Sequence, residues 1–267
     1  KIITMSDLLK VPTMADFMAQ GKQPEVLFWV GCAGSFDDRA KKITKAFVKL
    51  LNKANVKFAV LGTEESCSGD PARRSGNEFL FQMQALSNIE VMNAYEVQKV
   101  VTACPHCFNT LKNEYPELGG KYEVVHHTQL LKELLDDGKL TIEGGSFSGK
   151  KITFHDPCYL GRANDVYEAP RELIQKLDAE LVEMKRCKAK GLCCGAGGAQ
   201  MFKEPEKGNK DINIERTEDA LEVKPNFIAT GCPFCNTMMT DGVKNKEKEE
   251  DIQVLDIAEM IAQAQDL

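Results

Sequence analysis

The sequence lacks any apolar run of the length that a membrane-spanning helix needs, about 18 to 20 residues, and its most apolar short stretch covers only residues 26–30. The N-terminus lacks the apolar core of a signal peptide. An excess of basic residues is missing too, because 34 Lys and Arg stand against 40 Asp and Glu for a net charge of −6. That balance favours neither nucleic acid nor an anionic membrane surface as a partner. We therefore expect a cytoplasmic chain that binds no nucleic acid and reaches the inner membrane only peripherally, through a partner subunit.

Two common functional signatures are absent as well. The glycine-rich residues 195–198 have no strand leading directly into them and no Walker lysine pattern after them, which argues against nucleotide binding. No serine, histidine and acid stand in an arrangement that indicates a catalytic triad. Cysteine, in contrast, is abundant, with ten residues in 267. Because no export signal is present and the cysteines cluster, metal binding or redox chemistry is favoured over structural disulfides.

Five cysteines form a set in the C-terminal half, in the order C…CC…CxxC. They are Cys158, Cys193, Cys194, Cys232 and Cys235. Thiolates are soft ligands that suit zinc or iron–sulfur clusters. The side chains of adjacent cysteines usually diverge, so the pair at 193–194 suits a cluster of several irons better than one tetrahedral metal ion. The spacing predicts a site with several thiolate ligands.

Four cysteines of the first half repeat this pattern at a nearly constant distance. Two of the four pairs are separated by 126 residues and two by 128 residues; in order they are Cys32 with Cys158, Cys67 with Cys193, Cys104 with Cys232, and Cys107 with Cys235. Agreement at four positions indicates an internal duplication. The first copy is altered, because Ser68 stands where the second of the adjacent cysteines would be.

The pattern along the chain predicts alternating strands and helices in both halves. Strands are expected at 25–31, 57–61, 99–103, 122–126, 151–155, 180–184, 226–230 and 252–255, and helices at 37–52, 78–95, 129–135, 166–177, 213–223 and 257–264, with short helices beginning after residues 104 and 235. This alternation is typical of parallel sheets with crossover helices. We expect an α/β fold of two tandem Rossmann-like units, with the cysteines at strand C-termini. The expected boundaries are a lead-in at 1–24 with short helices starting at Thr4 and Thr13, a first unit at 25–143, a linker at 144–150 and a second unit at 151–267.

The chain resembles a known family over both halves, from about Val26 to the C-terminus, and two local motifs make the match in the C-terminal half highly specific. The segments HDPCYLGR at 155–162 and CCGAGG at 193–198, followed by CxxC, resemble the cysteine-rich (CCG) domain of heterodisulfide reductases and of related iron–sulfur subunits of lactate, glycolate, glycerol-3-phosphate and succinate oxidoreductases. The resemblance implies a non-cubane [4Fe-4S] cluster on Cys158, Cys193, Cys194, Cys232 and Cys235. It also implies an oxidoreductase subunit that carries electrons to a disulfide or thiol substrate or to a quinone-linked partner. A ferredoxin-type iron–sulfur subunit, a flavoprotein, or both would be its partners in a redox complex.

The altered first half leaves three interpretations open. Its four thiols, Cys32, Cys67, Cys104 and Cys107, suffice for a cuboidal [4Fe-4S] cluster or for zinc. They would also suit an altered cluster with an oxygen or open ligand, or the site is decayed. The alternative function is a non-catalytic scaffold subunit stabilised by zinc or by disulfides.

Five further residues are candidate neighbours of these sites. Cys187 has no counterpart in the first half and is expected to be an ordinary thiol. His155 either contacts the cluster or is a hydrogen-bonded structural residue. His106 lies inside the first CxxC, where it could face the site, and His126 and His127 end a strand on the same edge of the sheet, where packing is the favoured role.

Overall fold

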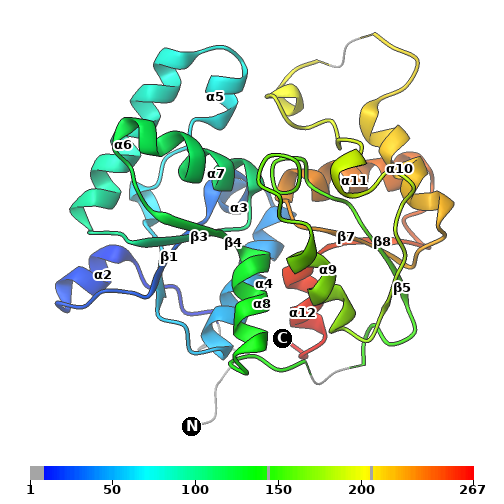
Figure 1. Cartoon of the computed structure of the whole chain (residues 1–267), viewed down its shortest axis with the longest axis horizontal. Helices are drawn as coiled ribbons and strands as arrows, with labels where there is room; N and C mark the ends of the chain where they lie inside the picture. The colour runs from blue at the N-terminus through cyan, green and yellow to red at the C-terminus, as the bar shows by residue number, and fades with distance from the viewer. Residues whose placement is uncertain (1–8, 143–144, 205–206) are drawn as a thin grey trace.

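The computed structural model describes residues 9–142, 145–204 and 207–267, and these residues form two four-stranded sheets that lie side by side (Figure 1). The first sheet has the order β2-β1-β3-β4, from β1 (Val26–Trp29), β2 (Phe58–Ala59), β3 (Lys99–Thr102) and β4 (Glu123–His126). The second has the order β6-β5-β7-β8, from β5 (Lys151–Phe154), β6 (Glu180–Leu181), β7 (Phe227–Thr230) and β8 (Gln253–Asp256). Every strand pair in both sheets is parallel. The predicted α/β fold and its duplication are confirmed, because the two orders are the same when the strands are matched in chain order.

The α-helices of the described residues are α2 (Met14–Ala19), which precedes β1, and α3 (Gly31–Phe36), α4 (Ala40–Lys53), α5 (Asp70–Arg74), α6 (Glu78–Ala94), α7 (Pro105–Asn109), α8 (His127–Asp136), α9 (Glu168–Gln175), α10 (Ile212–Glu222), α11 (Pro233–Asn245) and α12 (Ile257–Gln263). Three differ from the prediction. Gly31 takes φ +76°, a conformation that glycine adopts freely, and turns the chain from β1 straight into α3. Helix α5 was not predicted, and α11 runs for 13 residues where a short helix was expected.

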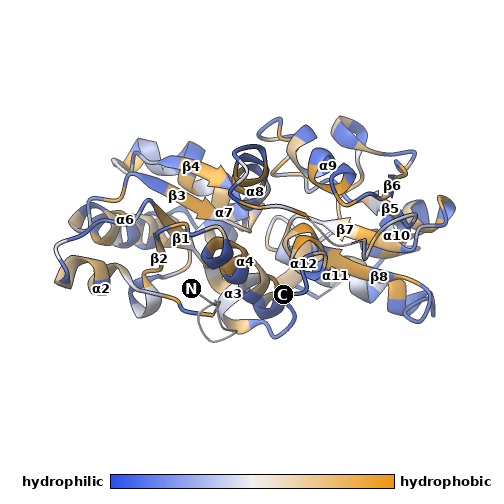
Figure 2. Ribbon diagram, turned by 90° about the horizontal axis from the view of Figure 1, so that it is seen from below, coloured by the Kyte–Doolittle hydropathy of each residue, from blue (hydrophilic) through white to orange (hydrophobic). Residues whose placement is uncertain are grey.

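A layer of four helices, α4, α8, α9 and α12, lies between the two sheets and joins them in one core (Figures 1 and 2). Helix α4 joins this core because its apolar side chains recur every three to four residues and are buried on one face. For example, the ring of Phe47 makes an edge-on contact with the ring of Phe28 in β1, with the ring centroids 5.0 Å apart. The outer face of the first sheet packs on α2 and α6, and the outer face of the second packs on α10 and α11. The shared central layer fixes how the two sheets sit relative to each other.

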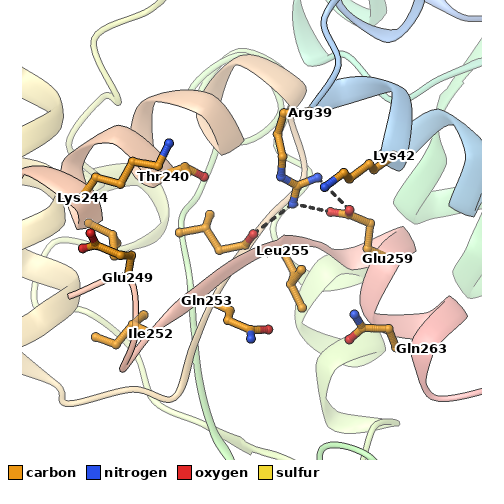
Figure 3. A pocket seen from close by; sticks show the side chains of 12 residues that line it. Arg39, Lys42, Thr240, Lys244, Glu249, Ile252, Gln253, Leu255, Glu259 and Gln263 are labelled. Atoms are coloured by element: carbon orange, nitrogen blue, oxygen red, sulfur yellow. Dashed lines mark hydrogen bonds and ion pairs between the residues drawn. The ribbon is translucent and has the colours of Figure 1, made fainter. Parts of the chain in front are cut away.

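Polar contacts cross this central layer as well. Arg39, just before α4, forms a two-pronged ion pair with Glu259 of α12, with both N–O distances 2.7 Å, and its guanidinium also donates to the carbonyl oxygen of Val254 at 3.0 Å (Figure 3). Deeper in the molecule, His127 Nε2 lies 2.9 Å from Asp256 Oδ1, and both side chains are fully buried. The cavity beside Arg39, about 330 Å³ in volume, is lined by no cysteine. It therefore belongs to the joint between the units and not to the cysteine sites.

The lead-in segment is docked on the first unit. Thr13 caps α2, its side chain accepting from the Asp16 N–H while Asp16 accepts from the Thr13 N–H at 2.8 Å. Thr13 also pairs with Val60 beside the edge strand β2. The helix expected from Thr4 lies outside the described residues. Among the helices that the structure describes, none combines the length and apolar character needed to cross a membrane.

Candidate metal centre

The five cysteines of the C-terminal set come together, although their segments are far apart in sequence. Cys158 follows β5, Cys193 and Cys194 lie in the long connection between β6 and α10, and Cys232 and Cys235 begin α11. The Sγ atoms of Cys194 and Cys235 are 3.3 Å apart. Cys193 is in hydrogen-bonding contact with both Cys158 and Cys194. Cys194, Cys232 and Cys235 are buried and the other two are half-buried, so the set has one side closer to solvent.

The glycine loop after the adjacent cysteines brings its backbone to the sulfurs. Gly195 takes φ +93° and donates its N–H to Cys193 Sγ at 3.3 Å. A Cβ on Gly195 would lie 3.2 Å from the Cβ of Ile212, so a larger residue would press on α10. The glycine therefore serves both a left-handed turn and an N–H···S contact.

The four cysteines of the N-terminal set are gathered in the corresponding place. Cys32 lies in α3, Cys67 in the loop before α5, and Cys104 and Cys107 at the start of α7. Cys32 donates to Cys67, and the hydroxyl of the buried Ser68 is in hydrogen-bonding contact with Cys107. The hydroxyl of Ser68, the residue that replaces a cysteine, thus lies against a sulfur of the set.

The two sets touch each other. Cys104 of the first set and Cys232 of the second, each the residue before its helix, are in hydrogen-bonding contact, and both are buried. Together with the contacts inside each set, this junction gives a series of neighbouring sulfurs that runs Cys107, Cys104, Cys232, Cys235, Cys194, Cys193, Cys158. Cys32 and Cys67 form a further contacting pair of the first set. The sequence predicted two sites but did not reveal that they meet.

Contacts among the sulfurs set which thiols ionise readily. The hydrogen bond from Cys32 lowers the pKa of Cys67 to about 6. Burial opposes ionisation of Cys232, yet hydrogen bonds from Cys104 and Cys235 outweigh it and lower the pKa of Cys232 to about 6. Contacts from the neighbouring thiols likewise lower the pKa of Cys193. In both sets, contacts between thiols therefore favour the thiolate, the form that binds metal.

Two acidic residues, Asp156 and Glu65, form ion pairs or hydrogen bonds with the segments that carry the cysteines. The carboxylate of Asp156, in the HDPC segment, forms a two-pronged ion pair with Arg171 at 2.8 and 2.9 Å and accepts the Lys188 N–H at 2.7 Å. Glu65 accepts the N–H groups of Val30 and Gly31 at 3.0 and 2.6 Å, where α3 begins. Burial raises the pKa of Glu65 to about 7. No local pattern marks these residues, because their partners are distant in sequence.

Of the five other candidate residues, some lie near the cysteine sites and others pack in the interior of the protein. His155 is fully buried, and one ring nitrogen lies within 4.8 Å of the Cys194 and Cys235 sulfurs. His106 lies 3.1 Å from Asp70 and stacks on Tyr159 at 4.6 Å, between the units. His126 and His127 contact each other at 3.2 Å inside the joint with Asp256, in keeping with packing at a strand end. Cys187 has Glu183, Asp156 and Arg171 as its charged neighbours and takes no part in the series of sulfurs.

The donors present fit an iron–sulfur cluster. Each set offers at least four sulfurs, the preferred ligands of such clusters. All ten cysteines are free thiols in the structure.

Three curated proteins are similar to the chain over nearly all of its length. A probable iron-sulfur-binding oxidoreductase, FadF, of Bacillus subtilis is 49% identical over 96% of this chain and 36% of its own length. An EtfAB:quinone oxidoreductase of Syntrophomonas wolfei is 48% identical over 91% of this chain and 35% of its own. One subunit of the dihydromethanophenazine:CoB–CoM heterodisulfide reductase of Methanosarcina barkeri is 35% identical over 90% of this chain and 59% of its own. The chain thus spans about a third to three fifths of the length of these relatives.

The family follows from the residues that match its sequence profile. The cysteine-rich domain named CCG matches residues 26–112 and 152–240, one stretch in each half. The first stretch contains the whole N-terminal set and the second the whole C-terminal set. The resemblance expected over both halves is therefore confirmed, the altered first half included. The chain belongs to the cysteine-rich (CCG) domain family.

Proposed function

We propose that the chain is the electron-carrying iron–sulfur part of a heterodisulfide-reductase-like oxidoreductase. A [4Fe-4S] cluster of the non-cubane type is held by Cys158, Cys193, Cys194, Cys232 and Cys235. The observation that carries the proposal is the contact between Cys104 and Cys232, which makes the two cysteine sets neighbours in the buried interior. A bound cluster supplies one-electron chemistry at this place, and the protein supplies the thiolates, the N–H donor of Gly195 and exclusion of water.

The second metal site is assigned to Cys32, Cys67, Cys104 and Cys107, with a [4Fe-4S] cluster or zinc as its occupant. Ser68 supports a centre different from the C-terminal one, because an oxygen stands where the family motif has a sulfur and lies against Cys107. The two units therefore have different tasks. Electrons pass between the C-terminal centre and a disulfide or thiol substrate, or a quinone-linked partner.

The partners are a ferredoxin-type iron–sulfur unit, a flavoprotein, or both. Support comes from the relatives, one of which is named an EtfAB:quinone oxidoreductase, and from the fact that this chain covers only part of their length. The complex is cytoplasmic and associates with the inner membrane through such a partner. Within this arrangement the chain acts as an oxidoreductase subunit.

Anaerobic purification with iron and acid-labile sulfide analysis tests the proposal. We expect brown protein with roughly four irons per occupied cluster and an EPR signal that Cys194→Ala removes or alters. The matched control is Cys187→Ala, since Cys187 lies outside the series of sulfurs. Colourless protein that contains zinc and no sulfide would support the scaffold alternative instead. Equal iron content and equal EPR spectra in both variants would remove Cys194 from the ligand set.

A further inference from the structure

One ring nitrogen of His155 is hydrogen-bonded to an arginine, the other has no hydrogen-bond partner, and the ring lies beside two cysteine sulfurs. Its Nδ1 lies 3.0 Å from Nε of Arg216, which is fully buried and comes from α10. Its Nε2 is buried and finds no hydrogen-bond partner in the described part of the chain. A ring nitrogen of His155 lies within 4.8 Å of the Cys194 and Cys235 sulfurs. Because Nδ1 is engaged by Arg216, we assign Nε2, the nitrogen without a partner, as the one that faces the sulfurs.

The partner of Nδ1 decides where the ring proton is. An arginine side chain has donors only, so Nδ1 must accept the hydrogen bond with its lone pair. A ring nitrogen that accepts a hydrogen bond carries no proton, so the neutral imidazole keeps its one proton on the other nitrogen. That proton is on Nε2. Arg216 is itself held in place, donating to the Arg186 carbonyl oxygen at 2.6 Å and to Asp219 at 3.1 Å.

This arrangement is the reverse of that of a metal-binding histidine. A histidine that binds a metal through one nitrogen usually donates the N–H of the other to a carboxylate, a carbonyl or water. Here the second nitrogen faces a donor, so Nε2 has no free lone pair for a metal. His155 therefore offers an N–H to the thiolates.

The first half contains an independent parallel. Trp29 lies three residues before Cys32, as His155 lies three residues before Cys158. Trp29 is fully buried in the same packed cluster as Cys104 and Cys107, and its Nε1 finds no partner within the described residues. An indole nitrogen can only donate. In both units, a buried ring at this position keeps an unpaired N–H.

We infer that His155 donates its Nε2–H to the Cys194 and Cys235 sulfurs and raises the reduction potential of the cluster there, with Arg216 fixing the proton on Nε2. The inference rests on the proposed function. Hydrogen bonds to cluster sulfurs are among the factors that set the potential. A donor stabilises the reduced cluster more because that state carries more negative charge. His155 is a positioning and tuning residue in this scheme and not a metal ligand.

Redox titration followed by EPR, on the reconstituted full chain, tests this. His155→Leu removes the donor, and we expect the equilibrium constant for one-electron reduction to fall about tenfold, as for the loss of one charge-assisted hydrogen bond, which is about 59 mV. His155→Gln keeps an N–H and restores most of the potential. The control Thr153→Val changes a buried side chain of β5, the strand that leads to His155, and leaves the potential as in the wild type.

Pulsed EPR of the wild type with ¹⁵N-labelled histidine gives a readout that does not depend on the variants. A weak nitrogen coupling, typical of N–H···S, supports the inference, and the strong coupling of a nitrogen bound to iron overturns it. An unchanged potential in His155→Leu with an intact cluster also overturns it, without touching the proposed function. Wild-type protein that takes up no iron overturns the proposed function, and this inference with it.

Discussion

The buried ion pair behind Cys158 gives the sharpest stability prediction. Arg171→Leu leaves the carboxylate of Asp156 without its guanidinium partner, in a place where the two side chains are only 4% and 3% exposed. Removing one member of a buried ion pair costs about 3–5 kcal/mol, because the other charge stays buried and uncompensated. One N–H, from Lys188, remains for Asp156 and does not replace the lost charge. We therefore expect the free energy of unfolding to fall by about 3–5 kcal/mol.

The matched control is Arg186→Leu. Arg186 also forms a two-pronged ion pair, with Asp219, but its side chain is 36% exposed, and Asp219 keeps its contact with Arg216. Such an exposed pair contributes about 0–1 kcal/mol. Urea unfolding followed by circular dichroism compares both variants with the wild type. The double variant with Asp156→Asn should recover part of the loss, because it removes the stranded charge.

Equal destabilisation of the chain by Arg171→Leu and Arg186→Leu would refute this reasoning. A loss in Arg171→Leu that Asp156→Asn leaves unchanged would refute it too. In either case the carboxylate of Asp156 would be solvated through a route that the structure does not show. The comparison tests whether the burial of the arginine side chain, and not the number of its hydrogen bonds, determines the loss of stability.

Two more stability predictions follow from close contacts. Gly242→Ala places a Cβ against the Thr217 side chain, where α10 and α11 approach each other, and should destabilise the chain by about 1–3 kcal/mol in urea unfolding. The control is Gly145→Ala, whose added Cβ has its nearest neighbour at 3.8 Å, and it should change the free energy of unfolding little. Burial raises the pKa of Glu65 to about 7, so the folded chain binds more protons than the unfolded chain between about pH 4.5 and 7. The free energy of unfolding should therefore fall by up to about 3 kcal/mol as pH rises through that window. Glu65→Gln should remove this dependence of the free energy of unfolding on pH. An identical pH dependence in the variant would rule out Glu65 as its source.

Local sequence signals predicted some parts of the fold better than others. All eight strands were predicted, because short apolar runs between helical patterns are local signals. The bounds were less accurate, as at Gly31, where one residue with a positive φ starts α3 in place of a longer strand. Helix α5 escaped prediction because it has only five residues. The domain boundaries at 25–143 and 151–267 stay a prediction.

The residues of the site also differ in whether the sequence could predict them. The cysteine sets could be predicted because the duplication repeats their spacing, and the altered position of Ser68 was visible from the same alignment of the halves. Arg216 could not be identified, since it meets His155 across 61 residues of sequence and lies in an ordinary amphipathic helix. The Asp156–Arg171 pair was equally hidden. Such pairs depend on how α9 and α10 pack on the second sheet.

The sequence by itself determined the duplicated α/β architecture, the family, and the residues of both cysteine sets, because strand alternation and ligand spacing are carried by the order of residues. Only the tertiary structure decided that the sets meet at Cys104 and Cys232. That contact follows from the shared layer of helices between the sheets, which turns the strand C-termini of both units toward each other. The tautomer of His155 was decided in the same way, since it depends on a buried partner from a different helix.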